Sequence, residues 1–316
     1  MMKNNTPTPV CLFVYNRPAE TRQALASLQA CRTSGERELY IFSDAAKTPE
    51  TEAEVAEVRR CIRRAYGFRA IHLDEAELNR GLAASIIRGV TRVLEAHGQA
   101  IVLEDDLLLS PDFLEYMDQA LAAYAGDKRI WSISGYGPDI PIPSEYPHGV
   151  YLTPRASSWG WGTWLDRWNC IDWEVKDYAD FRRDGEALRR FDEGGNDMSR
   201  LLALQQRGRI NSWAIRWCYA QFRRGMYTVY PVRSKVVNQG FGANASHAGW
   251  HDARHQVRLS GEKIEMVEEL EPDARLLTAF KRHQDLSLIS KAGYFLRLHG
   301  LGYRHAQKIF KKIINN

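Results

Sequence analysis

The chain has 316 residues, 44% hydrophobic and 26% charged, a composition typical of a globular protein, and its net charge of +4 does not predict a nucleic-acid partner. Its five cysteines are widely spaced and odd in number, with no CxxC pair, so the sequence indicates neither a disulfide framework nor a zinc knuckle. No signal-peptide pattern opens the sequence, and no apolar run approaches the roughly 20 residues of a membrane helix, so we expect a cytoplasmic protein.

The first 136 residues alternate between apolar runs typical of strands and amphipathic segments typical of helices. The predicted strands are residues 10–15, 38–43, 70–73, 100–103 and 129–134, and the predicted helices are residues 21–30, 50–66, 81–96 and one opening at Ser110-Pro111. The first run, Val-Cys-Leu-Phe-Val-Tyr, is continuous, as in strands buried on both faces. This alternation predicts an α/β fold with a doubly wound, mostly parallel sheet.

Polar residues follow three of these predicted strands. They are Tyr15-Asn16-Arg17, Ser43-Asp44 and Glu104-Asp105-Asp106. Ligands of such sheets bind outside the carboxyl ends of the strands, so the three clusters predict one shared site.

The acidic triplet Glu104-Asp105-Asp106 carries the most chemical information. Three adjacent carboxylates at the end of a buried strand repel one another and lose hydration, so a positive group should lie beside them. Mg²⁺ or Mn²⁺ is the natural candidate, because these cations are held by one or two protein carboxylates together with substrate phosphates. A solvated acidic turn is the alternative interpretation.

Taken in order, the motifs are more specific than any one of them. They are Phe13 to Pro18, Ser43-Asp44, Asn79-Arg80-Gly81-Leu82, Glu104-Asp105-Asp106 with Ser110-Pro111-Asp112-Phe113, Ser157 to Trp164, Asn211 to Trp217, and Asn238 to His247. Over roughly residues 8–250 this set resembles GT-A glycosyltransferases, closest to bacterial family-2-like sugar transferases, and its acidic motif is similar to that of the N-acetylglucosaminyltransferase I type. The resemblance implies a GT-A fold with a Trp-rich acceptor-side region and a helical C-terminal tail.

The resemblance also implies roles on the donor side. Asp44 would accept a hydrogen bond from the base, usually uracil, whose imide N–H suits an ionised carboxylate. Arg80, at the start of a helix, would meet the diphosphate or the sugar. Tyr15, Asn16 and Arg17 would line the nucleotide pocket, Glu104 and Asp105 would hold the ribose and the donor sugar, and Asp106 and the late His247 would bind the metal.

The acceptor side is expected in the Trp-rich segments. Indole rings suit sugar faces, and arginines donate hydrogen bonds to hydroxyls or phosphates. The candidates are Arg155, Trp159, Trp161, Trp213 and Arg216. The competing interpretation is a Trp-rich core between two lobes, and some of these rings must belong to it.

An inverting transferase needs a carboxylate that accepts the proton of the acceptor hydroxyl. In the N-acetylglucosaminyltransferase I type an Asp follows the Trp matched here by Trp213, yet this chain has Ala214, and Asn211 is not acidic either. Asp197 is the first substitute candidate for this catalytic base, and Asp166 is the second. If neither serves, the enzyme is retaining or impaired.

The chain is thus expected to consist of a nucleotide-sugar-binding half (1–136), an acceptor-side half of the same domain (137–260) and a basic helical tail (261–316). Residues 281–316 contain eight Lys or Arg and one acidic residue, Asp285. A basic amphipathic tail would lie on anionic lipid at the inner face of the cytoplasmic membrane. The same sequence pattern is equally compatible with a helix that packs on the rest of the protein or forms a dimer contact.

These features predict a metal-dependent hexosyl- or N-acetylhexosaminyltransferase. It would move a sugar from a UDP-sugar to a saccharide or lipid-linked saccharide during synthesis of bacterial O-antigen, capsule or lipooligosaccharide. A sugar nucleotidyltransferase is an alternative, disfavoured because the chain lacks an early Gly-rich loop with Lys. A sugar-nucleotide-binding protein that has lost turnover is the other alternative.

Overall fold

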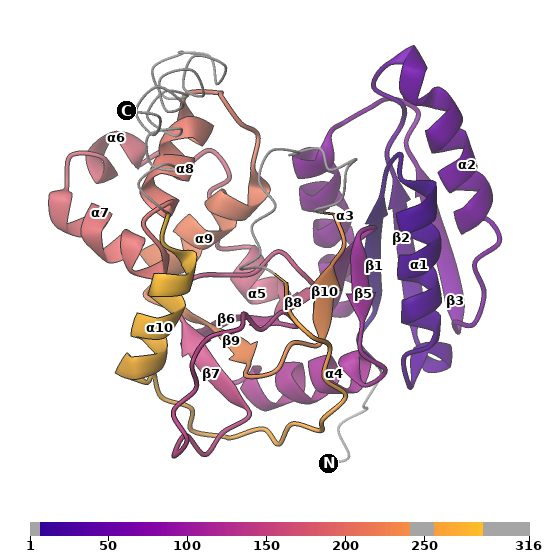
Figure 1. Ribbon diagram of the computed structural model, residues 1–316. Helices are drawn as coiled ribbons and strands as arrows, with labels where there is room; N and C mark the ends of the chain where they lie inside the picture. The colour runs from indigo at the N-terminus through magenta and orange to yellow at the C-terminus, as the bar shows by residue number, and fades with distance from the viewer. Residues whose placement is uncertain (1–6, 241–255, 287–316) are drawn as a thin grey trace, which may run out of the picture.

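A central sheet of eight strands organises the part of the chain that the computed structural model describes, residues 7–240 and 256–286 (Figure 1). The strands are β1 (Val10–Val14), β2 (Glu38–Ser43), β3 (Ala70–Glu75), β4 (Gln99–Glu104), β6 (Ile130–Ser134), β7 (Val150–Thr153), β8 (Trp161–Trp164) and β9 (Tyr227–Pro231). Their order is β3-β2-β1-β4-β8-β6-β9-β7, and β7 and β8 run against the other six. The sheet is therefore mostly parallel, as predicted.

Both faces of this sheet are buried, which explains the unbroken apolar run of β1. Val10, Leu12 and Val14 contribute to one hydrophobic core, and Cys11 and Phe13 contribute to the other. Successive strand residues point to opposite faces, so a strand between two cores must be apolar at every position.

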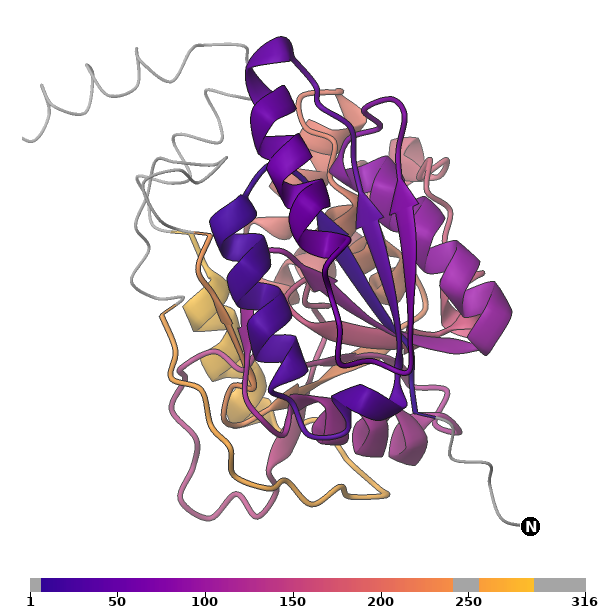
Figure 2. The same cartoon turned by 90° about the vertical axis from the view of Figure 1, so that its right-hand side faces the viewer.

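Helices cover the two faces of the sheet. They are α1 (Pro18–Gln29), α2 (Glu52–Ile62), α3 (Leu82–His97), α4 (Phe113–Tyr124), α5 (Leu165–Trp168), α6 (Tyr178–Phe181), α7 (Gly185–Phe191), α8 (Met198–Gln206), α9 (Trp213–Arg223) and α10 (Ala274–Gln284), with short 3₁₀ turns η1 (Ser34–Glu36), η2 (Pro49–Thr51) and η3 (Asp192–Gly194). Helices α1, α2 and α4 belong to one core, and α3 and α9 belong to the other. Figure 2 shows α1 and α2 side by side on one face of the first strands.

The predicted strands and helices of the first 136 residues match the structure closely, apart from the helix that follows the acidic triplet. That helix, α4, begins at Phe113 with Asp112 as its N-cap residue, so the prediction that Ser110-Pro111 opens it was wrong. The chain first forms β5 (Leu107–Leu109), which pairs with β10 (Val236–Asn238) in a separate two-stranded sheet. The backbone N–H of Ser110 continues this pairing by donating to the carbonyl of Lys235.

Both predicted halves of the domain, 1–136 and 137–260, contribute strands to the eight-stranded sheet. Helix α10 packs on β7 and β9, where the Phe280 ring meets the Tyr230 ring edge-on at 5.1 Å. None of the helices in the described residues is long and apolar enough to span a membrane. The expected tail helices after residue 286, like His247, lie outside the described residues.

Candidate active site at the carboxyl edge of the sheet

The carboxyl ends of β1, β2 and β4 meet at one edge of the sheet. In the strand register Phe13 lies beside Glu104, and Val14 lies beside Ser43. The structure therefore places the three predicted polar clusters next to one another. The edge continues through β8, since Trp161 pairs with Val102 and the chain just before it lies at the same end.

Arg17 lies between two carboxylates of the acidic triplet. Its guanidinium Nη1 is 2.9 Å from Asp106 Oδ2 and 3.8 Å from Asp105 Oδ1. The backbone N–H of Tyr15 donates to Asp105 Oδ2 at 3.2 Å. The end of β1 and the start of α1 thus hold the triplet from one side.

The charges in this cluster are unequal, with three carboxyls facing one guanidinium. Loss of solvent and repulsion from its two neighbours raise the pKa of Glu104 to about 8. Loss of solvent and repulsion from Asp106 raise the pKa of Asp105 to about 7, against the opposing effect of Arg17. Burial raises the pKa of Asp106 as well, and Arg17 again opposes the shift. The cluster would therefore be stabilised by further positive charge.

Asp106 has the geometry of a cation ligand. Its Oδ1 is buried and has no hydrogen-bond partner among the described residues, while the chain leaving β10 passes so close that a Cβ on Gly240 would lie 2.2 Å from Oδ2. Within the described ranges no three His, Cys, Asp or Glu side chains form a metal cage by themselves. Mg²⁺ and Mn²⁺ sites on phosphate substrates need only one or two protein carboxylates, so Asp106 fits a shell completed by the donor.

Asp44 holds the turn that precedes α3. Its Oδ1 accepts from the N–H groups of Ala45 and Arg80, both at 2.9 Å, and its Oδ2 accepts from Gly81 N–H at 2.8 Å and Asn79 Nδ2 at 3.1 Å. Gly81 has a φ of 76°, a conformation that favours glycine, and this orients the turn. Both carboxylate oxygens are thus occupied by the protein, and the contact of Asp44 with a base stays a prediction.

The other predicted donor-side residues surround this edge. The Tyr15 hydroxyl accepts from the N–H of Lys47, and Asn16 Nδ2 donates to Glu54. The guanidinium of Arg80 is 3.9 Å from Asp74 Oδ1 and is about one-third exposed. Arg80 therefore keeps solvent access beside the Asp44 turn.

Two of the three tryptophans predicted to bind sugar belong to the core. Trp161 and Trp213 are 1% and 3% exposed, and their rings pack against each other at 5.2 Å. A buried ring cannot stack on a sugar, so the prediction was wrong for both. Trp159 is half-buried, lies at the carboxyl edge just before β8 and packs on Tyr136 at 4.6 Å. A contact of its ring with a sugar stays a prediction.

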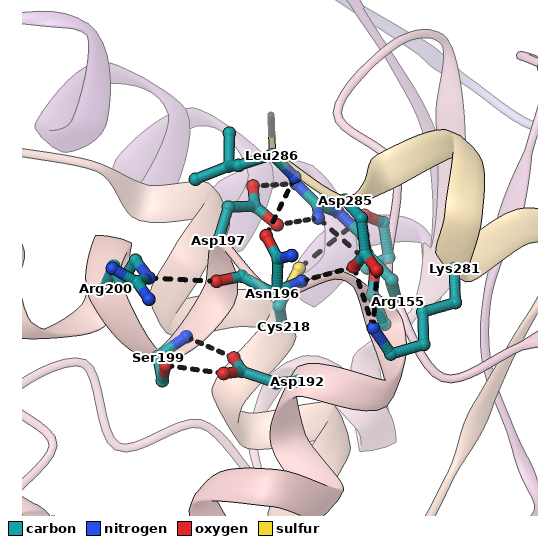
Figure 3. A network of polar contacts seen from close by, with 12 residues as sticks. Arg155, Asp192, Asn196, Asp197, Ser199, Arg200, Cys218, Lys281, Asp285 and Leu286 are labelled. Carbon is teal, nitrogen blue, oxygen red and sulfur yellow. Dashed lines mark hydrogen bonds and ion pairs between the residues drawn. The ribbon is translucent and has the colours of Figure 1, made fainter. Parts of the chain in front are cut away.

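Arg155 and Asp197, predicted separately as a sugar ligand and a catalytic base, bind each other. Two guanidinium nitrogens of Arg155 meet the two carboxylate oxygens of Asp197 at 2.6 and 2.9 Å (Figure 3). Both oxygens of Asp197 are therefore used in a largely buried pair. We correct both predictions: this pair closes the loop before α8, and Asp197 is not placed to accept a proton.

Asp166 is not part of the site. Trp164, at the end of β8, pairs with Gln99 at the start of β4, whereas Glu104 stands at the other end of that strand. Five strand residues separate the two ends by roughly 16 Å. Asp166 instead forms ion pairs with Lys128 and Arg167, so its prediction as a base is corrected as well.

Arg216 is engaged by neighbouring protein groups. Its guanidinium donates to the carbonyls of Ser212 and Trp173 and to Asn211 Oδ1. The guanidinium also lies over the Trp173 ring, 5.7 Å from the ring centroid. These contacts hold Arg216, a residue of α9, against the protein. A contact with substrate stays a prediction.

Sequence reasoning missed the contacts that bring β10 to the acidic triplet. The N–H of Gln239 donates to the carbonyl of Asp106, and the buried Lys235 ammonium pairs with Asp112 and with the carbonyls of Ser260 and Glu262. Nothing in the sequence signalled this burial, because Lys235 follows Arg233 and Ser234 in a polar run that is usually exposed.

The mostly parallel sheet, covered by helices and with polar clusters at its carboxyl edge, is consistent with a GT-A fold. Residues 10–136 match the family model described as glycosyl transferase family 2. The match covers 127 of the 316 residues, so this part of the chain is similar to that family.

Solved structures show weaker similarity. A mannosyltransferase from Pyrobaculum calidifontis, in complex with GDP-Man and Mn²⁺, is 15% identical with a TM-score of 0.34, and the match covers 53% of this chain and 49% of that one. Mouse xyloside xylosyltransferase 1 is 11% identical over 71% and 84% of the two chains, with a TM-score of 0.35. The galactosyltransferase LgtC, with donor and acceptor sugar analogues, is 14% identical over 73% and 74%, also at 0.35. The chain spans about half the length of the mannosyltransferase.

Proposed function

We propose that this protein transfers a sugar from a UDP-sugar to a saccharide or lipid-linked saccharide acceptor in the synthesis of a bacterial surface polysaccharide. The observation that carries the proposal is the unequal charge at the carboxyl edge, where the buried Oδ1 of Asp106 has no partner beside Glu104, Asp105 and Arg17. A divalent cation with a diphosphate is the ligand whose charges and oxygen preference suit that arrangement.

Each residue of the edge then has a task in the reaction. Asp106 would hold the cation, which when bound neutralises the diphosphate as it leaves. Arg80 and the Asp44 turn would position the donor, and Trp159 would support the acceptor sugar. The acceptor hydroxyl oxygen would bond to the anomeric carbon as the bond from that carbon to the phosphate oxygen breaks, and the diphosphate would leave with the electron pair of that bond. The products would be the glycoside, UDP and the proton released from the hydroxyl.

Turnover with a panel of UDP-sugars and Mn²⁺ tests this proposal. We expect acceptor-dependent release of UDP with one donor, and loss of that release when the metal is chelated. Thermal unfolding gives an independent readout, since a donor present at 100 times its Kd would stabilise the folded protein by about 2.7 kcal/mol. Failure of every UDP-sugar to stabilise the protein or turn over would contradict the proposal.

A second candidate is a sugar-nucleotide-binding protein without turnover. The capture of Asp197 by Arg155 favours it, because that pair removes the leading candidate for the base. Calorimetry that detects UDP binding while no acceptor supports UDP release would favour this candidate over the enzyme.

A further inference from the structure

Arg17 occupies the position beside Asp106 where a bound cation would act. Its Nη1 lies 2.9 Å from Asp106 Oδ2, and its side chain keeps 21% of its surface exposed. Arg17 is the N-cap residue of α1 and lies two positions after Tyr15, whose backbone N–H donates to Asp105. The backbone of Arg17 thus lies at the site, and its side chain is partly exposed to solvent.

The two carboxylate oxygens of Asp106 differ in their contacts. Arg17 pairs with Oδ2, Gly240 closes the same side, and Oδ1 is buried without a hydrogen-bond partner. A divalent cation on this carboxylate would lie within a few ångströms of the guanidinium. The two positive groups would repel each other strongly at that distance, since little water separates them.

The charges of the site suggest where Arg17 would go. Counting only the residues that the structure describes, the cluster has two unmatched negative charges when all three carboxylates are ionised and Arg17 is in place. One divalent cation would neutralise them. A donor diphosphate brings new negative charge, and a guanidinium binds phosphate oxygens well.

We propose that Arg17 is an internal cation: it pairs with Asp106 when no donor is bound and moves to the donor diphosphate when the metal takes Asp106. The inference rests on the proposed function. It assigns Arg17 a positioning role that couples metal binding to donor binding, because each ligand relieves the repulsion that hinders the other.

Direct Mn²⁺ binding, measured by the electron paramagnetic resonance signal of free Mn²⁺ with and without UDP, tests the inference without any turnover. In the wild-type chain we expect weak binding of Mn²⁺ alone and tighter binding by at least about tenfold with UDP. Arg17→Gln should tighten Mn²⁺ binding alone by about fivefold to tenfold and shrink the effect of UDP to below about threefold. Arg17→Lys, which keeps a charge but loses the planar fork, should fall between the two.

Arg22→Gln is the matched control, because Arg22 lies on the same helix and pairs with the exposed Glu57. It should keep both wild-type Mn²⁺ constants. Mn²⁺ binding by Arg17→Gln that is equal to or weaker than that of the wild type would overturn the inference. If Arg17→Gln does not fold, the same comparison is made with Arg17→Lys, and Mn²⁺ binding no tighter than that of the wild type would overturn the inference. If the wild-type chain binds neither Mn²⁺ nor UDP, the proposed function fails; if it binds both and Arg17→Gln leaves the Mn²⁺ constant unchanged, only the role of Arg17 fails.

Discussion

Two arginine–aspartate pairs in this molecule have the same residue types and differ in the charges that surround them. Arg155 and Asp197 match one positive charge with one negative charge through two hydrogen bonds, and both side chains are largely buried. Arg17 and Asp106 belong to a cluster of three carboxyls with one guanidinium, and a buried oxygen there has no partner. The comparison teaches that a matched pair indicates a structural contact, whereas unmatched buried charge indicates a ligand site.

The loop that contains Asp197 shows what a matched pair achieves. Asn196 N–H donates to Asp285 Oδ1, and Leu286 N–H donates to Asn196 Oδ1, while Lys281 pairs with Asp285 (Figure 3). The loop therefore joins the end of α10 to Arg155 and to the segment that leads to Trp159. Its polar groups are used to hold elements together.

The largest expected effect is on the unmatched cluster. Asp106→Asn should reduce kcat/KM by at least about 10³-fold, about 4 kcal/mol, because the cation loses its protein ligand. Asp166→Asn is the matched control at the other edge of the sheet and should retain wild-type turnover. Steady-state kinetics with the preferred UDP-sugar measures both, and unchanged turnover in Asp106→Asn would remove the acidic triplet from the mechanism.

The second effect is on the matched pair and concerns stability. Arg155→Met should lower the free energy of unfolding by about 3 kcal/mol, because it leaves the Asp197 carboxylate buried without its partner. The double variant Arg155→Met/Asp197→Leu should recover most of this loss, since no charge is then left unpaired. Urea denaturation measures these changes; a stable Arg155→Met variant that has lost turnover would instead restore this pair to the active site.

The third effect is a pH dependence produced by the unmatched cluster. The pKa values of Glu104 and Asp105 are raised on folding to about 8 and about 7, so between about pH 4 and pH 8 the folded protein binds more protons than the unfolded chain. Their contribution to stability is therefore complete below about pH 4 and is lost as the pH rises through this window.

Glu104→Gln removes one of these titrations. The variant should be more stable than the wild type by about 1–2 kcal/mol at pH 8, with a shallower decline between pH 4 and pH 8. Thermal unfolding across the pH range, without metal or nucleotide, measures the difference. Asp180→Asn, on the exposed surface of α6, should leave the wild-type profile unchanged, and parallel profiles for Glu104→Gln and the wild type would show that the carboxyl of Glu104 titrates normally.

The smallest effect distinguishes the edge tryptophan from the core tryptophans. Trp159→Ala should raise the KM for the acceptor about fivefold, because a flat surface for the sugar is lost, and should leave the KM for the donor unchanged. Trp213→Phe should leave both KM values unchanged while it lowers stability by about 1–3 kcal/mol. An acceptor KM that responds to Trp213 and not to Trp159 would reverse the assignment.

The fold of the first 136 residues was readable from local patterns. A strand buried on both faces must be apolar at every position, as β1 is, and the polar residues that follow such strands must lie at their carboxyl edge. The acidic triplet was found for the same reason, since its three carboxylates are adjacent along the chain.

The sequence by itself determined the strand and helix pattern of the first 136 residues and the position of the acidic triplet, because these depend on near neighbours along the chain. Only the tertiary structure decided that Asp197 is held by Arg155, that Trp161 and Trp213 are core residues, and that Gly240 lies against Asp106. These contacts join residues that are 42 to 134 positions apart, or depend on which face of an element is covered. Composition cannot distinguish a tryptophan that binds sugar from one that fills a core, because both need the same large apolar ring.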